Sequence, residues 1–142
     1  MNKLWARLER VENFMKVSVN PAAIISDGVA WKSLKNLMER FHFDTDEARI
    51  LMGDMAASTY YKGINKLEGR LSKDEKERIS LLLGIYKDLR ILFIDSEQAT
   101  SWIERANSLP PFNGKTPREF MLDGSLLRLA DVRRFLDYWR GY

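Results

Sequence analysis

The chain has 142 residues, of which 45% are hydrophobic and 30% are charged, and it contains no cysteine. This composition is typical of a folded globular protein, and it excludes disulfides, thiolate metal sites and cysteine nucleophiles. The formal net charge of +3 is compatible with nucleic-acid binding without demanding it, and the absence of cysteine leads us to expect a reducing, cytoplasmic environment.

The first twenty residues predict an amphipathic helix. Its apolar positions recur at alternating steps of four and three residues, which places them on one stripe: Leu4, Leu8, Val11 and Met15. Acidic side chains interrupt the segment, so it is neither a signal peptide nor a membrane span. Because such a stripe needs a covering surface, we expect it to pack on a second copy of the chain in a homodimer.

A short element and a longer helix follow. Asn20 and Pro21 have the order of a helix cap and a first-turn proline, and Gly28 is expected to end or interrupt this element. The helical spacing of large apolar residues then predicts a helix over residues 31–41.

Two helices joined at a glycine come next. Asp44 and, three residues later, Glu47 have the spacing of a capping box and predict a helix over residues 45–52 that ends at Gly53. A further helix is expected over residues 57–67. These lengths, with a glycine at the turn, are typical of a helix-turn-helix, in which the second helix lies in the major groove of DNA.

The second helix of this pair carries polar side chains at its outward positions. If it enters the groove, hydroxyls and Lys62 would meet phosphates, whereas Asn65 could pair with an adenine edge. The residues that we expect to contact DNA are Ser58, Thr59, Tyr61, Lys62 and Asn65. The same spacing fits a plain helical bundle without DNA contact, so both interpretations stay open at this point.

A long helix dominates the middle of the chain. Ser72 and Glu75 form a second predicted capping box ahead of a helix over residues 73–93. Its inward face is expected to consist of Ile79, Leu82, Leu83, Tyr86, Leu89 and Phe93. A shorter helix is predicted between residues 95 and 105, with inward-facing Ala99, Trp102 and Ile103.

The last quarter begins with a strong helix-start signal. Thr116, Pro117 and Glu119 have the order of an N-cap, a first-turn proline and the carboxylate of a capping box. They predict a short helix over residues 117–122, after which a final helix is expected over residues 125–140. The predicted buried stripe of the final helix consists of Leu126, Leu129, Val132, Phe135, Leu136 and Trp139.

Basic and aromatic side chains are concentrated in this final helix. Arginine makes two-point contacts with carboxylates and stacks on rings, and Trp, Tyr and Arg are enriched at binding hot spots. Residues 140–142 are expected to form a free end where the final helix closes, and such an end usually frays unless something holds it. The end of the chain therefore suits an interface. In the preceding loop, Phe112 is expected to anchor a fixed corner in the core.

No segment shows the sustained alternation of a strand, so the sequence predicts an all-α fold. The best internal boundary is the turn after Gly69, which divides the chain into an N-terminal module with the helix-turn-helix, residues 1–70, and a C-terminal helical module, residues 71–142. His42 is the only histidine, which excludes a metal site built from several imidazoles. We expect neither an enzyme nor a cofactor.

The C-terminal pattern resembles a known family. The residues that carry the resemblance are Asn107, Pro111, Phe112, Gly114, Thr116, Pro117, Gly124, Val132, Arg133, Leu136, Asp137, Arg140 and Gly141. Together they resemble the toxin-binding domain of the MbcA/ParS/Xre antitoxins, from about Leu51 to the C-terminus and most specifically after Trp102. The chain departs from the family pattern at Arg49, where relatives have a small residue packed against the DNA-reading helix.

This resemblance implies a function and its residues. Such antitoxins are partners of RES-domain toxins, which consume NAD, and their C-terminal region covers the entrance of the toxin's NAD pocket. Carried over by position, the expected toxin-binding residues are Arg133, Arg134, Tyr138, Arg140, Gly141 and Tyr142. The resemblance also implies that the chain binds operator DNA and represses its own operon. Two alternatives remain, a helix-turn-helix regulator without a toxin partner and a helical scaffold protein without DNA contact.

Overall fold

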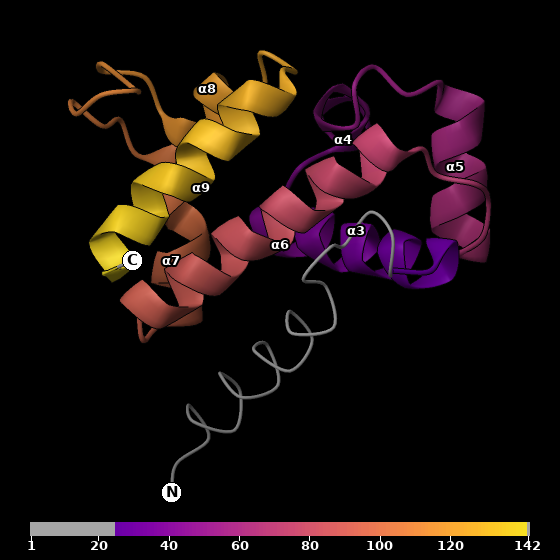
Figure 1. Ribbon diagram of the computed structural model, residues 1–142, viewed down its shortest axis with the longest axis horizontal. Coiled ribbons are helices and arrows are strands. Elements are labelled where there is room, and N and C mark those ends of the chain that lie inside the picture. The colour runs from indigo at the N-terminus through magenta and orange to yellow at the C-terminus, as the bar shows by residue number, and fades with distance from the viewer. Residues whose placement is uncertain (1–24, 142) are drawn as a thin grey trace, which may run out of the picture.

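The computed structural model describes residues 25–141, and this part of the chain is entirely helical (Figure 1). The predicted all-α fold is therefore confirmed, with a pair of helices joined by a tight turn in the N-terminal half and a helical part behind it. The predicted N-terminal helix with the stripe from Leu4 to Met15, the Asn20–Pro21 cap and Tyr142 lie outside the described residues.

Seven α-helices and one short 3₁₀ helix form the described part of the chain. They are α3 (Asp27–Phe41), α4 (Thr45–Leu51), α5 (Ala57–Lys66), α6 (Lys73–Leu92), α7 (Ser96–Ser101), η1 (Trp102–Glu104), α8 (Pro117–Met121) and α9 (Leu126–Arg140). The bounds of α4, α5, α6, α8 and α9 differ from the predicted ones by at most one residue at either end. All three predicted capping boxes are present, at the starts of α4, α6 and α8.

The start of α3 differs from the prediction. The helix begins at Asp27, and Gly28 lies in its first turn instead of ending a separate element. The side chain of Ser26 caps this earlier start, because it accepts a hydrogen bond of 3.2 Å from the backbone N–H of Val29. A Cβ atom at Gly28 would lie 3.3 Å from the carbonyl oxygen of Leu67. The glycine therefore permits a close approach between two chain segments.

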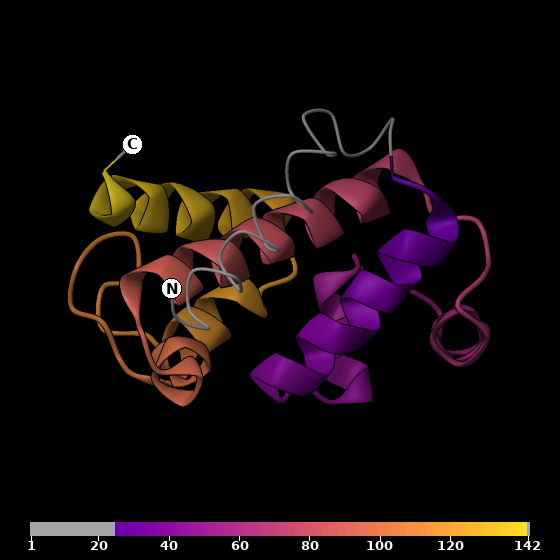
Figure 2. The ribbon, with the colours of Figure 1, turned by 90° about the horizontal axis from the view of Figure 1, so that it is seen from below.

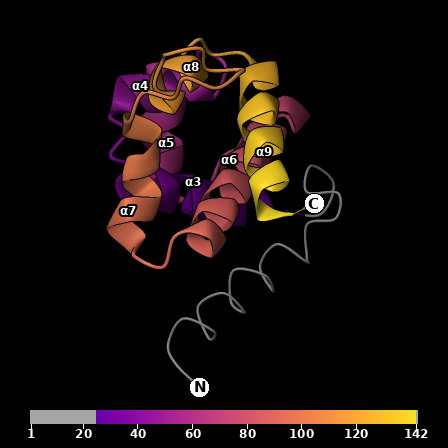
Figure 3. The ribbon, with the colours of Figure 1, turned by 90° about the vertical axis from the view of Figure 1, so that its left-hand side faces the viewer.

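Helix α6 is the centre of the molecule. It runs between α3 on one side and α9 on the other, and α9 lies beside it in nearly the same direction (Figures 1 and 2). Viewed along the long axis, α9 lies beside α6, and α7 is on the opposite side of the bundle (Figure 3). Since α6 is covered from more than one side, its buried residues extend beyond the predicted inward face. Ile85 is fully buried, whereas Leu83 and Tyr86 are only partly buried.

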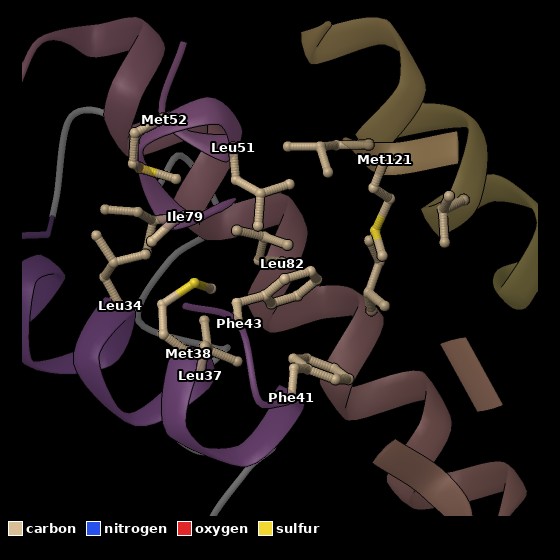
Figure 4. Packing of buried hydrophobic residues seen from close by; sticks show 14 of the residues in the cluster. Leu34, Leu37, Met38, Phe41, Phe43, Leu51, Met52, Ile79, Leu82 and Met121 are labelled. Atoms are coloured by element: carbon tan, nitrogen blue, oxygen red, sulfur yellow. The ribbon is translucent and has the colours of Figure 1, made fainter. Parts of the chain in front are cut away.

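One hydrophobic core connects the two halves of the chain. Leu34 and Met38 of α3, Leu51 of α4 and Ile79 of α6 belong to one buried cluster, which also includes Met121 of α8 from the C-terminal part (Figure 4). The modules on the two sides of the proposed boundary at residue 70 therefore share one core. The boundary remains a prediction that the two modules have different functions.

Arg78 joins the same two parts by polar contacts. This side chain of α6 is almost completely buried, and its Nη1 donates hydrogen bonds to the carbonyl oxygens of Leu51, at 3.1 Å, and Gly124, at 2.7 Å. Its Nε pairs with Asp74 one turn earlier at 2.7 Å. One guanidinium group thereby binds both the end of α4 and the connection between α8 and α9. Hydrogen bonds to a charged donor are the stronger ones in proteins.

Candidate functional site

The five residues predicted to contact DNA lie together on the outer face of α5. The inner face of this helix consists of buried Tyr60 and Gly63, with partly buried Ile64. The side chains that face solvent are those of Ser58, Thr59, Tyr61, Lys62 and Asn65, which we call the reader face. The spacing of these residues, at three and four positions, is that of one side of an α-helix. The structure brings the five side chains together, and their contact with DNA remains a prediction.

The start of α5 offers backbone donors to a ligand. Its N-cap is Ala56, and no side chain of the described residues caps the first turn. The first N–H groups of a helix have no partner within the helix, and together with the helix dipole they favour an anion such as a phosphate. Lys62 and Lys66 add exposed positive charges to the same helix.

The position of α5 depends on a close contact between Gly63 and Trp31. A Cβ atom at Gly63 would lie 2.2 Å from Cζ2 of the Trp31 ring, so only glycine fits at this point of α5. The indole Nε1 of Trp31 donates a hydrogen bond of 2.8 Å to the carbonyl oxygen of Gly69, just beyond the helix. Glycine is a poor helix former, so its presence inside α5 has no explanation in the sequence alone. The packing of the indole ring supplies the reason.

Arg49 braces the turn between α4 and α5. Its Nε donates a hydrogen bond of 2.7 Å to the carbonyl oxygen of Met55, and its Nη1 lies 3.4 Å from Asp46. The small residue that packs inward at this point of α4 is Ala48, which is fully buried. The departure from the family pattern at Arg49 therefore leaves the turn intact, because its guanidinium binds the turn backbone.

At the other end of the molecule, the residues predicted to bind a toxin divide into two groups. Arg134 and Tyr138 point to solvent, with 78% of the Arg134 side chain and 72% of Tyr138 exposed, and Gly141 is an exposed left-handed C-cap of α9. Arg133 and Arg140 instead face α6, with 23% and 11% of their side chains exposed. The toxin contacts of all these residues remain predictions, and Tyr142 lies outside the described part.

Arg140 was expected to lie at a free end, but the structure places it against α6. It lies within the last turn of α9, and its Nη1 is 3.0 Å from Oδ1 of Asp88, a fully buried residue of α6. The Nε of Arg133 is 3.3 Å from Oδ2 of Asp88 and 2.9 Å from Oδ1 of Asp137. An ion-pair network inside the molecule therefore holds the end of this helix. Hydrophobic periodicity gave no signal for Asp88, because a charged residue in a long helix is normally solvated.

The two carboxyl groups of this network have different acidities. Burial raises the pKa of Asp88 to about 7, the neighbouring Asp137 acts in the same direction, and Arg140 and Arg133 oppose the rise. Burial also acts to raise the pKa of Asp137, but hydrogen bonds with Asp88 and Arg133 outweigh it, so the pKa of Asp137 is lowered. Asp88 is thus the group of this pair that holds a proton more readily.

A chain of aromatic rings leads from the core to the exposed end of α9. Phe112, which is buried as predicted, contacts both Phe120 and Phe135 with ring centroids 5.2 and 5.0 Å apart. Phe135 contacts Trp139 at 6.2 Å, and Trp139 contacts Tyr138 at 5.5 Å. Trp139 is 54% exposed, so its assignment to the buried stripe was wrong. Nothing covers the outer side of its ring within the described residues.

Residues 25–141 contain no group of three or more His, Asp or Glu side chains that could hold a metal ion. Among the described helices, none combines the length and the hydrophobicity of a membrane span. His42 is an exposed left-handed C-cap of α3, which gives it a structural role. The acidic side chains of Asp44 and Glu47 form the capping box of α4.

Comparison with known proteins identifies the helix-turn-helix. Residues 21–84 match the antitoxin Xre-like helix-turn-helix domain, a stretch that includes α3, α4, α5 and the first part of α6. A relative from Sinorhizobium fredii (strain NBRC 101917 / NGR234), the uncharacterized protein y4oB, is 37% identical over 105 residues, which are 74% of this chain and 79% of the relative. Residues 21–84 thus form an antitoxin Xre-like helix-turn-helix domain, which supports membership of the Xre antitoxin family, and the chain is a relative of y4oB over about three quarters of its length.

Proposed function

We propose that this protein is an antitoxin that neutralises a RES-domain, NAD-consuming toxin by covering the toxin's active site, and that it represses its own operon by binding operator DNA. It acts by binding, in the bacterial cytoplasm where operator DNA is located. The observation that carries the proposal is the position of two different exposed surfaces, the reader face of α5 and the end of α9, at opposite ends of the long axis (Figures 1 and 2). DNA and a protein partner would not compete for either surface.

The DNA-binding half of the proposal is tested with duplexes from upstream of the gene. Fluorescence anisotropy of the full-length protein at two salt concentrations should show a steep loss of affinity with salt, because each phosphate contact releases a counterion. A scrambled duplex of equal length should bind more weakly. The absence of any preference for the upstream duplex would remove the repressor role.

The toxin-binding half is based on the exposed end of α9, which we call the end surface: Arg134, Tyr138 and Trp139. It combines two exposed aromatic rings with a solvated guanidinium, and such residues dominate the energetics of protein interfaces. Its cation and apolar rings fit a partner pocket that is apolar inside and acidic at the rim.

Two exposed tyrosines, one on each proposed surface, provide variants that serve as controls for each other. Tyr138 lies on the end surface, and Tyr61 lies on the reader face. During co-expression with the RES-domain toxin of the same operon, the wild type should restore growth and Tyr138→Ala should weaken the rescue, whereas Tyr61→Ala should keep it. For operator binding the expectation is reversed: Tyr61→Ala should weaken it and Tyr138→Ala should leave it unchanged. Equal rescue by both variants would contradict the assignment of the toxin to this end.

A stand-alone transcriptional regulator is the second candidate. It is favoured by the extent of the domain match, which covers residues 21–84 and stops before α8 and α9. In that case the protein would bind its operator, but no toxin from the same operon would co-purify with it. A pull-down with the full-length protein at native expression level therefore separates the two candidates.

We also propose that the active form is a homodimer, because helix-turn-helix proteins commonly read two half-sites with two copies of the motif. Multi-angle light scattering of the purified protein should give twice the chain mass of 16.6 kDa. A monomeric mass at micromolar concentration, together with operator binding by one chain, would contradict this part of the proposal.

A further inference from the structure

A charged cluster lies between α6 and α9, and we define it as the lock: Asp88 of α6 and Arg133, Asp137 and Arg140 of α9. Asp88 is completely buried and pairs with both arginines, at 3.0 Å and 3.3 Å. A buried carboxylate is costly unless charged partners surround it, so its two arginines cannot turn away without leaving it unpaired.

Helix α6 has a gap that admits one of these arginines. A Cβ atom at Gly84 would lie 1.3 Å from Nη1 and 2.4 Å from Cζ of Arg133, so any other residue at this position would collide with the guanidinium. Gly84 is one helical turn before Asp88. Glycine is unfavourable within a helix, and here it makes room for the side chain that reaches the buried carboxylate.

The spacing of the lock residues determines how α9 is turned about its own axis. Positions 133, 137 and 140 follow one another at four and three residues, so they occupy one side of the helix. Arg134 and Tyr138 each come one residue after a lock position, about 100° further around the helix. When the lock residues face α6, Arg134 and Tyr138 are therefore turned to solvent, as their exposure shows.

We propose that Asp88 is a positioning residue for partner binding, and that Arg133 and Arg140 act through it by holding the end surface in place instead of touching the partner. This inference rests on the proposed function, because it assumes that the end surface binds the toxin. It gives the two arginines a different role from that of Arg134, which stands outside the lock.

A double-mutant cycle separates the lock from direct contact. Full-length wild type, Asp88→Asn, Arg140→Gln and the double variant are titrated by calorimetry against the purified RES-domain toxin of the same operon, at a pH above the pKa of Asp88, where its carboxyl group is ionised. If Arg140 acts through Asp88, each single change should weaken binding about tenfold and the double change should also cost about tenfold, because both remove the same interaction. If Arg140 touches the toxin, the two losses should multiply to about a hundredfold.

Three results would overturn the inference. They are a multiplicative double variant, an Asp88→Asn variant with unchanged affinity, and a control that weakens binding as much as Asp88→Asn does. The control is Ile79→Val, a buried change on the same helix that packs toward α3 and α4 (Figure 4). It lowers general stability without touching the lock, so it should leave the affinity for the toxin unchanged.

Hydrogen exchange tests the lock without any partner. In Asp88→Asn, the backbone amides of residues 134–141 should exchange at least about tenfold faster than in the wild type, whereas Ile79→Val should not single out this stretch. Wild-type protein that binds no toxin would refute the proposed function while this measurement still decides the lock. Unchanged exchange at the end of α9 would refute the lock itself.

Discussion

Arg118 of α8 and Glu47 of α4 form a two-point ion pair, with Nη2 2.6 Å from Oε1 and Nε 3.1 Å from Oε2. The same guanidinium donates hydrogen bonds to the carbonyl oxygens of Phe41 and His42 at the C-terminal end of α3, where a positive charge also interacts favourably with the helix dipole. It lies over the ring of Phe43 at 4.5 Å. One side chain of the C-terminal part thus holds the beginning of the helix-turn-helix.

Replacing Arg118 by methionine should destabilise the protein by about 2–3 kcal/mol, because both partners of the pair are only about one-fifth exposed and Glu47 loses its cation. Urea denaturation followed by circular dichroism measures the change. The matched control is Arg134→Met, whose exposed pair with Asp131 should contribute less than about 0.5 kcal/mol. Equal urea midpoints for the two variants would show that the contacts of Arg118 contribute no more than a surface pair.

Gly63→Ala should displace α5 from Trp31. Alanine is the better helix former by about 1 kcal/mol, so an unhindered position would gain stability. The close approach of the indole ring predicts a net loss of about 1–3 kcal/mol instead, together with weaker operator binding. Thermal unfolding gives the sign, and Lys66→Ala on the exposed side of the same helix is the control. A more stable Gly63→Ala protein would show that the ring does not constrain α5.

Asp88 should make stability depend on pH near neutrality. Burial raises its pKa from the ordinary value of 3.8 to about 7, so between these values the folded protein keeps a proton that the unfolded chain has released. The stabilising contribution of this proton is complete below the lower value and is lost as the pH rises through the upper one. The lowered pKa of Asp137 acts in the more acidic range.

The Asp88→Asn variant cannot titrate at this position. Between about pH 4 and about pH 8, the melting temperature of the wild type should fall relative to that of the variant by at least about 4 °C. Differential scanning calorimetry at constant ionic strength makes the comparison. Parallel curves for the two proteins would mean that the carboxyl group of Asp88 does not change its protonation in this range.

Lys62 and Asn65 should affect operator binding in different ways. Lys62→Gln removes one proposed phosphate contact, so the slope of log affinity against log salt should decrease by about one. Asn65→Ala should leave this slope unchanged and lower the discrimination between operator and non-operator DNA by about 1–3 kcal/mol. Anisotropy titrations over a range of salt concentrations measure both. A slope that is insensitive to Lys62 would place this side chain outside the phosphate contacts.

Local signals in the sequence predicted the helices well. Ser72 with Glu75, and Thr116 with Pro117 and Glu119, mark the starts of α6 and α8 to the residue, because a capping box is formed by atoms only a few positions apart. The sequence pattern does not predict the earlier start of α3, although Ser26 offers a cap, because a glycine such as Gly28 is typical of a helix end. The residues of the reader face were assigned to one side of a helix, and the structure places them there.

Contacts between residues far apart in the chain could not be predicted from local sequence signals. Trp139 follows the apolar periodicity of α9 and was assigned to the core, yet the core ends before its ring and leaves it half-exposed. Arg133 and Arg140 have the sequence pattern of a solvated basic tail, whereas both face the buried Asp88. An amphipathic pattern predicts which side of a helix is buried by apolar contacts. It cannot indicate that a buried charge on a neighbouring helix, here Asp88, forms ion pairs with residues on another side of α9.

The all-helical class, the positions of most helix ends and the polar outer side of α5 can be predicted from the amino-acid sequence, because they depend on hydrogen bonds and side-chain spacing within a few residues. The folded arrangement is needed to explain why Gly63 and Gly84 are glycines, which arginines of α9 are internal, and how the two halves share one core. These features depend on contacts between segments far apart in the chain. Such contacts exist only in the folded chain.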